Sequence, residues 1–242
     1  MSIARDGDFG YTDFGYSRPI RASFGSGGSE PYASALRRGT AEVLYLQELR
    51  RGREPKSVEL DLGRWSAEAD TIDFQLLASV RGPVLDVGCG PARMVRAARA
   101  LGMDALGIDI SLAAVEIARA SGVQALHASI FDPLPAEGSW QTVLLVDENI
   151  GIGGDATALL ARCLELISFD GEIVVELHPD DSRDRTFTGR LVDARGAVSA
   201  TFPWAELGLN GLLERADEVG LALRQSWSVG GRSFCRLANN LA

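Results

Sequence analysis

From Gly82 onward, short β-branched runs alternate with alanine-rich segments of helical character. This alternation is typical of a parallel sheet, because parallel neighbours need long crossover connections. It predicts an α/β protein with a doubly wound, mostly parallel sheet. The strands are expected at residues 83–87, 105–108, 123–127, 142–146 and 172–177, and the intervening helices at residues 92–101, 112–121 and 155–168. Ser111 and Asp155 are the candidate N-caps of the last two helices.

The end of the chain departs from this alternation. A helix is expected near residues 204–219, followed by two strand-like runs that Gly230 and Gly231 separate. Glycine supplies the positive φ of tight hairpin turns, so an antiparallel hairpin is predicted to complete a sheet of seven strands. Residues 179–203, rich in Asp, Arg, Thr and Gly, are interpreted as an insertion over the carboxyl edge of the sheet.

The first part of the chain follows another pattern. Residues 1–31 contain six glycines and no periodic apolar positions, which indicates an irregular arm. Helices are expected from residue 31 to about 51 and from residue 66 to about 79. We therefore divide the chain into an N-terminal arm and helical lid, residues 1–63, and a core, residues 64–242, that contains the insertion.

Composition excludes several classes of protein. A net charge of −9 repels polyanions, so nucleic acid is not an expected partner. The apolar runs are far shorter than the roughly 20 residues of a membrane helix, and the N-terminus lacks the apolar region of a signal peptide. We therefore expect a cytoplasmic protein. Three widely spaced cysteines and two histidines predict neither a disulfide framework nor a metal cluster.

The segment VLDVGCGPARM at residues 84–94 indicates a ligand-binding site. A strand ends at Val87, Gly88 and Gly90 permit a tight turn with close backbone approach, and Pro91 suits the start of a helix. A helix N-terminus at the carboxyl end of a central strand is a ligand-binding position in α/β sheets. Asp109 lies 21 residues after Gly88, where a carboxylate can accept both hydroxyls of a ribose.

Two classes of cofactor fit this turn. A nicotinamide dinucleotide favours GxGxxG, and Arg93 stands at the third glycine position. The strings DVGCGPAR and GIDIS instead resemble the class I S-adenosylmethionine-dependent methyltransferases, whose first motif is an acid followed by GxGxG. Asp86, Gly88 and Gly90 match that motif, and Ala92 departs from it.

This resemblance covers about residues 64–238 and implies a Rossmann-like fold. It also implies S-adenosyl-L-methionine as cofactor and S-adenosyl-L-homocysteine as product. The glycine turn would hold the amino acid part of the cofactor, Asp109 the ribose and Ile110 the adenine. The adenine site would be completed by Ser129 and Ile130 or else by Asp132. The full cofactor-binding set that the resemblance implies is Asp86, Gly88, Gly90, Asp109, Ile110, Ser129, Ile130, Asp147 and Trp65. Ile110 and Trp65 have a second interpretation as core residues.

Methyl transfer is an in-line displacement that depends on alignment and exclusion of water, and a protonated acceptor also needs a base. The fourth and fifth strands end in DENI and HPDD, so Glu148 and His178 are the candidate catalytic groups. A solvated acid and a structural histidine are the alternatives. Asn149, and Tyr16 from the arm, are candidate substrate contacts. The fifth strand lacks the acid and amide of magnesium-dependent relatives, so no metal is expected.

Taken together, these features predict a methyltransferase that acts on an oxygen, nitrogen or other nucleophile of a small molecule, mainly through proximity and orientation. Two alternatives stay open: a non-catalytic scaffold that binds the cofactor, and a methyltransferase for protein or RNA. Association into a homodimer also stays open.

Overall fold

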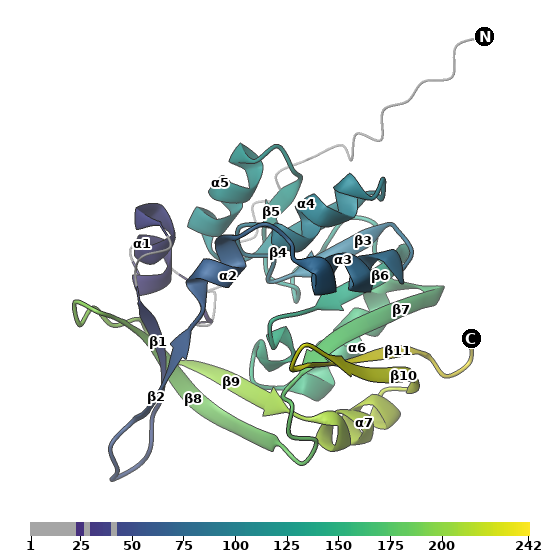
Figure 1. Ribbon diagram of the computed structural model, residues 1–242. Helices are drawn as coiled ribbons and strands as arrows, with labels where there is room; N and C mark the ends of the chain where they lie inside the picture. Colours follow the sequence, from purple (N-terminus) through teal and green to yellow (C-terminus); the bar gives the residue numbers. More distant parts are fainter. Residues whose placement is uncertain (1–22, 27–29, 40–42) are drawn as a thin grey trace.

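The computed structural model describes residues 23–26, 30–39 and 43–242, and its main body is a seven-stranded sheet (Figure 1). The strand order is β10-β11-β7-β6-β3-β4-β5. The strands are β3 (Val84–Val87), β4 (Ala105–Asp109), β5 (Ala125–His127), β6 (Trp140–Leu145), β7 (Ile167–Leu177), β10 (Leu221–Val229) and β11 (Arg232–Asn239). Strands β3 to β7 pair in parallel. Strands β10 and β11 form an antiparallel hairpin, and β11 pairs antiparallel with β7. The predicted Rossmann-like sheet is therefore confirmed.

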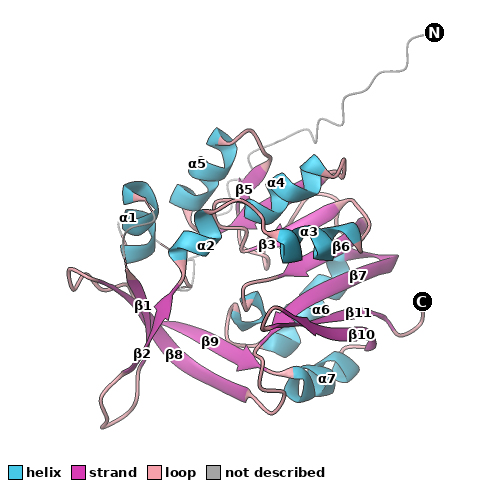
Figure 2. Ribbon diagram, in the orientation of Figure 1, coloured by secondary structure: helices cyan, strands magenta, loops and turns pink. Residues whose placement is uncertain are grey.

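Helices cover both faces of this sheet (Figure 2). The helices on one face are α3 (Thr71–Ala78), α4 (Arg93–Ala100) and α5 (Leu112–Ala120), and those on the other are α6 (Ala156–Leu166) and α7 (Leu209–Glu218). Adjacent residues of one strand point to opposite faces, so Val84 packs with α3 and α4 while Leu85 packs with α6. No helix among the described residues has both the length and the apolarity to cross a membrane.

Local capping explains where three of these helices begin. Asp155 accepts a hydrogen bond from the Ala158 amide, and Ser111 accepts one from the Ala114 amide, as predicted. The helix expected from residue 66 to about 79 is α3, which begins only at Thr71, and a separate short helix, α2 (Leu62–Ser66), precedes it. Asp70 and Asp73 form a reciprocal capping box that fixes the start of α3, and this is why the helix begins later than predicted.

A second, four-stranded antiparallel sheet was not predicted. Its order is β2-β1-β8-β9, and its strands are β1 (Leu44–Glu48), β2 (Lys56–Leu60), β8 (Asp184–Asp193) and β9 (Phe202–Leu207). The helix expected over 31–51 is correct only for α1 (Pro31–Arg38), which ends at Gly39 with φ +96°. Leu44 and Leu46 form one side of a strand and not a helical stripe, because their partners in β8 lie far along the chain.

The region interpreted as an insertion, 179–203, supplies β8 and the start of β9 to this second sheet. The helix expected from 204 begins only at Leu209, since residues 204–207 continue β9. Leu44, Leu191 and Phe202 pack with Tyr32 of α1 and Leu62 of α2 in a third apolar cluster. The division into a 1–63 arm and a 64–242 core stays a prediction, although β1 and β2 pair within a sheet that also contains β8 and β9.

The second sheet meets the carboxyl edge of the main sheet at the loop that follows β6. A Cβ placed on Gly151 of that loop would lie 2.4 Å from the Ala205 carbonyl oxygen and 2.6 Å from Nε1 of Trp204. Only a residue without a side chain permits this approach. The second sheet thus lies directly beside the ends of the strands that carry the predicted site residues.

Phe202→Ala tests how firmly the second sheet belongs to the folded unit. The ring is 1% exposed and lies 5.6 Å from the Phe24 ring and 6.2 Å from that of Trp204, between ring centroids. Its removal is expected to lower the free energy of unfolding by about 3–5 kcal/mol in urea titration. Phe169→Ala, at a ring 65% exposed, is the matched control and should cost less than about 0.5 kcal/mol. Equal effects would contradict the prediction.

Candidate active site

A cavity of about 400 Å³ opens at the carboxyl ends of β3, β4 and β6. The other side of the cavity is closed by residues of the second sheet, of α2 and by Tyr32 of α1. The structure brings eleven of the predicted residues to its wall: Trp65, Asp86, Gly88, Gly90, Asp109, Ile110, Ser129, Ile130, Asp147, Glu148 and Asn149. Two predicted residues are not part of this wall as described: His178 does not line it, and Tyr16 lies outside the described residues.

The glycine turn after β3 is held by backbone and side-chain contacts. The amides of Gly88 and Cys89 donate to the Ile108 carbonyl at 2.8 and 3.0 Å, and Gly88 has a φ of +69°. Nδ2 of Asn149 donates to the carbonyls of Val87 and Gly88 at 2.8 and 3.1 Å. A Cβ on Gly88 would lie 2.8 Å from that nitrogen. Asn149 therefore supports the turn, and its contact with substrate stays a prediction.

Asp109 links the end of β4 to the same turn. Its carboxylate accepts a hydrogen bond from the Gly90 amide at 2.8 Å and one from the Ser111 amide at 2.7 Å. Burial raises the pKa of Asp109, and the two amides oppose this shift. A carboxylate has about four acceptor positions, so two amide donors leave capacity for the hydroxyls of a bound ligand.

Asp86 is a buried carboxylate that faces the cavity, with 2% of the residue exposed. Within the described chain, no hydrogen bond reaches its carboxylate. Burial raises its pKa to about 7, Arg93 opposes the rise, and the nearby carboxylates of Asp147 and Asp109 add to it. Burying an acid without a partner is costly, and a cationic group in the cavity would supply the missing interaction.

The segment after β5 contains both sets of residues predicted for the adenine, and only one set lines the cavity. Ser129 and Ile130 line the cavity, whereas Asp132 does not. The Asp132 carboxylate instead accepts a hydrogen bond from the Ser129 amide at 3.0 Å and so shapes the loop. The geometry thus favours Ser129 and Ile130 for contact with a ligand.

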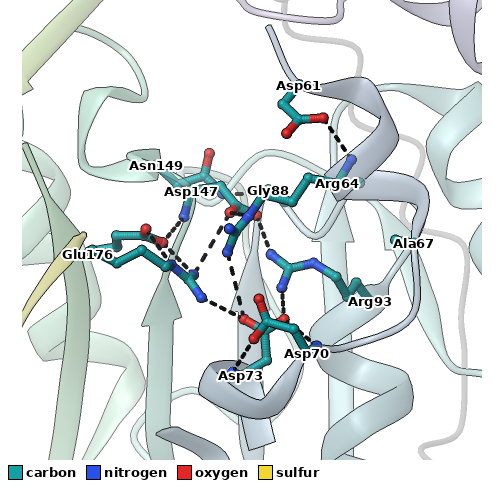
Figure 3. A network of polar contacts seen from close by, with 12 residues as sticks. Asp61, Arg64, Ala67, Asp70, Asp73, Gly88, Arg93, Asp147, Asn149 and Glu176 are labelled. Atoms are coloured by element: carbon teal, nitrogen blue, oxygen red, sulfur yellow. Dashed lines mark hydrogen bonds and ion pairs between the residues drawn. The ribbon is translucent and has the colours of Figure 1, made fainter. Parts of the chain in front are cut away.

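A network of buried ion pairs supports the loop after β6 (Figure 3). Arg93 donates to Asp147 at 2.7 Å and pairs with Asp73. Arg232 binds both oxygens of Glu176 at 2.7 Å and reaches Asp73 at 2.8 Å. Glu176 in turn accepts a hydrogen bond from the Asp147 amide at 2.7 Å. Five elements are thereby fixed around one face of the cavity.

This network was not predicted from the sequence. Asp73, Glu176 and Arg232 belong to no recognisable sequence motif. Arg93 stands out in the sequence only because it occupies the third glycine position of the dinucleotide-binding pattern. The ion pair between Asp73 and Arg232 joins residues 159 positions apart. The one local signal was a charged residue in each of several segments that are otherwise apolar.

Glu148 sits at the end of this supported loop. Asp147 and Glu148 have φ values of +54° and +61°, a region that non-glycine residues rarely adopt. The Glu148 carboxylate lines the cavity and accepts no hydrogen bond from the described residues. Burial raises its pKa, with further increases from Glu206 and Glu176 and an opposing effect of Arg183. His178, in contrast, accepts a hydrogen bond at Nδ1 from the Asp180 amide at 3.1 Å.

Two aromatic residues near the N-terminus complete the wall. Tyr32 is 4% exposed, and its hydroxyl lies 3.3 Å from the position that a Cβ on Gly90 would take. Its ring lies 5.4 Å from that of Phe24 and 6.1 Å from that of Trp65. The Tyr32 hydroxyl has no hydrogen-bond partner among residues 23–26, 30–39 and 43–242. The hydroxyl belongs to a residue of the cavity wall, so it is available to a bound ligand.

Comparison with known proteins agrees with this geometry. Residues 84–171 match the family model described as a methyltransferase domain. Comparison with curated protein sequences gives no match. The residues that match begin at β3 and contain the glycine turn, Asp109 and the loop after β6.

Solved structures show the same fold at low identity. A SAM-dependent methyltransferase from Bacteroides fragilis, in complex with S-adenosyl-L-homocysteine, aligns with a TM-score of 0.72 and 20% identity over 87% of this chain and 94% of that one. The glycopeptide N-methyltransferase MtfA aligns with a TM-score of 0.56 and 13% identity over 71% and 91% of the two chains. The 1,6-didemethyltoxoflavin-N1-methyltransferase from Burkholderia thailandensis aligns with a TM-score of 0.50 and 17% identity, covering 73% and 83%.

Residues 84–171 therefore match a methyltransferase domain, and the fold is that of the class I S-adenosylmethionine-dependent methyltransferases. This confirms the resemblance stated from the glycine motif.

Gly88→Ala tests whether the turn must be free of a side chain. The new Cβ would displace the Asn149 amide, so binding of S-adenosyl-L-homocysteine is expected to weaken at least about tenfold in calorimetry. Gly102→Ala is the matched control, because Gly102 also has a positive φ, +81°, but has no atom within 4 Å of the added Cβ. Both variants carry the backbone cost of about 1 kcal/mol. Equal loss of affinity in both would contradict a specific role for the Gly88 turn.

Asp86→Asn tests the buried carboxylate through the pH dependence of stability. The folded-state pKa of about 7 exceeds the ordinary 3.8, so between these values the folded protein retains a proton that the unfolded chain has released. The stability of the ligand-free protein should therefore fall as the pH rises through this window. Asp86→Asn removes this contribution, and its melting temperature should change less between about pH 4 and about pH 8. Identical pH profiles would show that Asp86 is charged when folded.

Proposed function

We propose that this protein transfers a methyl group from S-adenosyl-L-methionine to a small-molecule acceptor. The observation that carries the proposal is the cavity itself, in which the glycine turn, Asp109 and the loop after β6 face one enclosed space. Such a cavity at the carboxyl ends of the strands, where the strand order reverses between β3 and β6, is the usual ligand position in open α/β sheets.

The residues present fit the cofactor. Gly88 and Gly90 leave the backbone open for close approach, and a Cβ at Gly88 would obstruct the turn. Asp86 offers an unpartnered carboxylate to the cationic amino group, and Asp109 offers its remaining acceptor positions to the ribose hydroxyls. Ile110, Ser129 and Ile130 form the wall assigned to the adenine.

When bound, the cofactor supplies a methyl group activated by a sulfonium centre. The chain's own contribution is to position the acceptor and to exclude water, which are the main sources of rate in such a displacement. Trp65 and Tyr32 cover the space from one side, and Asp147 is held in place by Arg93. Glu148 is the carboxylate available to hold a proton from the acceptor.

A small molecule suits the size and charge of the site. The cavity volume lies in the usual range for small ligands, roughly 300–1000 Å³. Its acidic lining is unfavourable for a phosphate backbone. Two of the structural neighbours are named as methyltransferases of 1,6-didemethyltoxoflavin and of a glycopeptide, and these names support a specialised small-molecule acceptor.

Direct measurement of binding and transfer tests the proposal. The protein should bind S-adenosyl-L-homocysteine in calorimetry, and Asp109→Ala should abolish detectable binding because it removes the ribose acceptor and the anchor of the Gly90 amide. Incubation with labelled S-adenosyl-L-methionine and fractionated metabolites should place the label in small molecules. Binding without any methylated product would favour a scaffold, and label in protein or RNA would favour a macromolecular acceptor.

A further inference from the structure

The cavity has a second half that the cofactor residues do not account for. Away from the glycine turn, its wall is apolar and aromatic, and the second sheet supplies much of it. The apolar and aromatic wall residues outside the set assigned to the cofactor include Phe24, Leu46, Val58, Leu60, Phe131 and Trp204. Phe24 and Trp204 lie 5.5 Å apart between ring centroids, so a flat apolar body could pack against them.

The charge of the same half is negative. Glu59, Asp61 and Glu148 contribute carboxylates, and Arg93 is the cavity's one cationic residue among those the structure describes. That guanidinium is already committed to Asp73 and Asp147. An acidic, partly apolar space without a free cation disfavours an anionic ligand and favours a cationic one.

Glu148 is placed to receive that cation. It follows β6, which lies on the opposite side of β3 from β4, so Glu148 and the ribose-binding position at Asp109 flank the glycine turn. Its carboxylate accepts no hydrogen bond from the described residues, unlike Asp61, which caps the Arg64 amide at 2.9 Å. The Tyr32 hydroxyl, which has no hydrogen-bond partner among the described residues, is a further polar group of this cavity wall that a polar ligand can contact.

We propose that the methyl acceptor is an amine carried on an apolar, aromatic body, and that Glu148 takes the proton from its ammonium group. This inference rests on the proposed function. The N–H bond of the ammonium breaks and its proton passes to the Glu148 carboxylate. The freed lone pair forms the new C–N bond with the methyl carbon, while the C–S bond breaks and its electron pair stays on sulfur. The products are the N-methylammonium ion, the neutral thioether and a protonated Glu148.

The surroundings of Glu148 suit this role. The charged groups that act on it are Glu206 of β9, Glu176 of β7, the adjacent Asp147 and Arg183. Glu206 is paired with Arg183 and Arg185, and Glu176 is paired with Arg232. These two carboxylates therefore do not compete with Glu148 for a cationic ligand. Burial and the three carboxylates raise the pKa of Glu148, which brings a carboxylate closer to the pH at which a general base works best.

A matched set of ligands tests the inference without turnover. Phenethylamine, 2-phenylethanol and 3-phenylpropionate are titrated into the full-length protein by calorimetry, with and without saturating S-adenosyl-L-homocysteine. We expect the amine to bind at least about tenfold more tightly than the alcohol, and the acid to bind most weakly. The affinity for the amine should fall as the pH is lowered through the raised pKa of Glu148, because the carboxylate loses its charge.

Glu148→Gln should remove both the preference for the amine and its pH dependence. Glu54→Gln makes the same change of charge at an exposed residue outside the cavity wall and should retain both. Equal binding of the three ligands, preference for the acid, or no binding of the amine to protein that binds S-adenosyl-L-homocysteine overturns the inference. If the protein prefers the amine but fails to bind S-adenosyl-L-homocysteine, the result would support the amine site and refute the proposed cofactor.

Discussion

The buried ion-pair network between Asp73, Arg93, Asp147, Glu176 and Arg232 holds the site together. It joins α3, α4, the loop after β6, β7 and β11, which are elements from nearly the whole length of the core. Burying such charges is unfavourable unless each is paired and hydrogen-bonded. Here each member contacts more than one other, so removing either arginine would leave buried carboxylates without a counter-charge, at a cost of about 3–5 kcal/mol. The network therefore specifies one geometry rather than simply adding stability.

The second consequence concerns the loop after β6. Two successive non-glycine residues, Asp147 and Glu148, adopt positive φ values that cost of order 1 kcal/mol or more each. They persist because Arg93 and Glu176 hold Asp147 by its side chain and its amide. The strained conformation directs Glu148 toward the cavity, and the second sheet then closes the space around it. The backbone strain, the ion-pair network and the closure of the cavity thus all involve Asp147 and Glu148.

The parts of this arrangement that the sequence predicted are local ones. The glycine turn, Asp109, the N-caps and the C-terminal hairpin depend on short motifs, and the structure contains all of them. The second sheet escaped prediction because β1 pairs with β8 across a long stretch of chain, and Leu44 and Leu46 satisfy a helical pattern as readily as a strand pattern. The ion-pair network escaped for the same reason: no local pattern reveals which distant charge a buried Arg232 will meet.

Arg93 shows how one position can decide between two uses of a fold. In a dinucleotide-binding turn the equivalent position is a glycine, which lets the helix pack closely on the strand. Here the position carries a guanidinium that is 3% exposed and bonded to two carboxylates. With Arg93 so committed, Asp86 and Glu148 face the cavity without a cationic partner from the described chain, and the cavity has a negative surplus. A cationic donor and a cationic acceptor can both be held in such a space, whereas the pyrophosphate of a dinucleotide would be repelled.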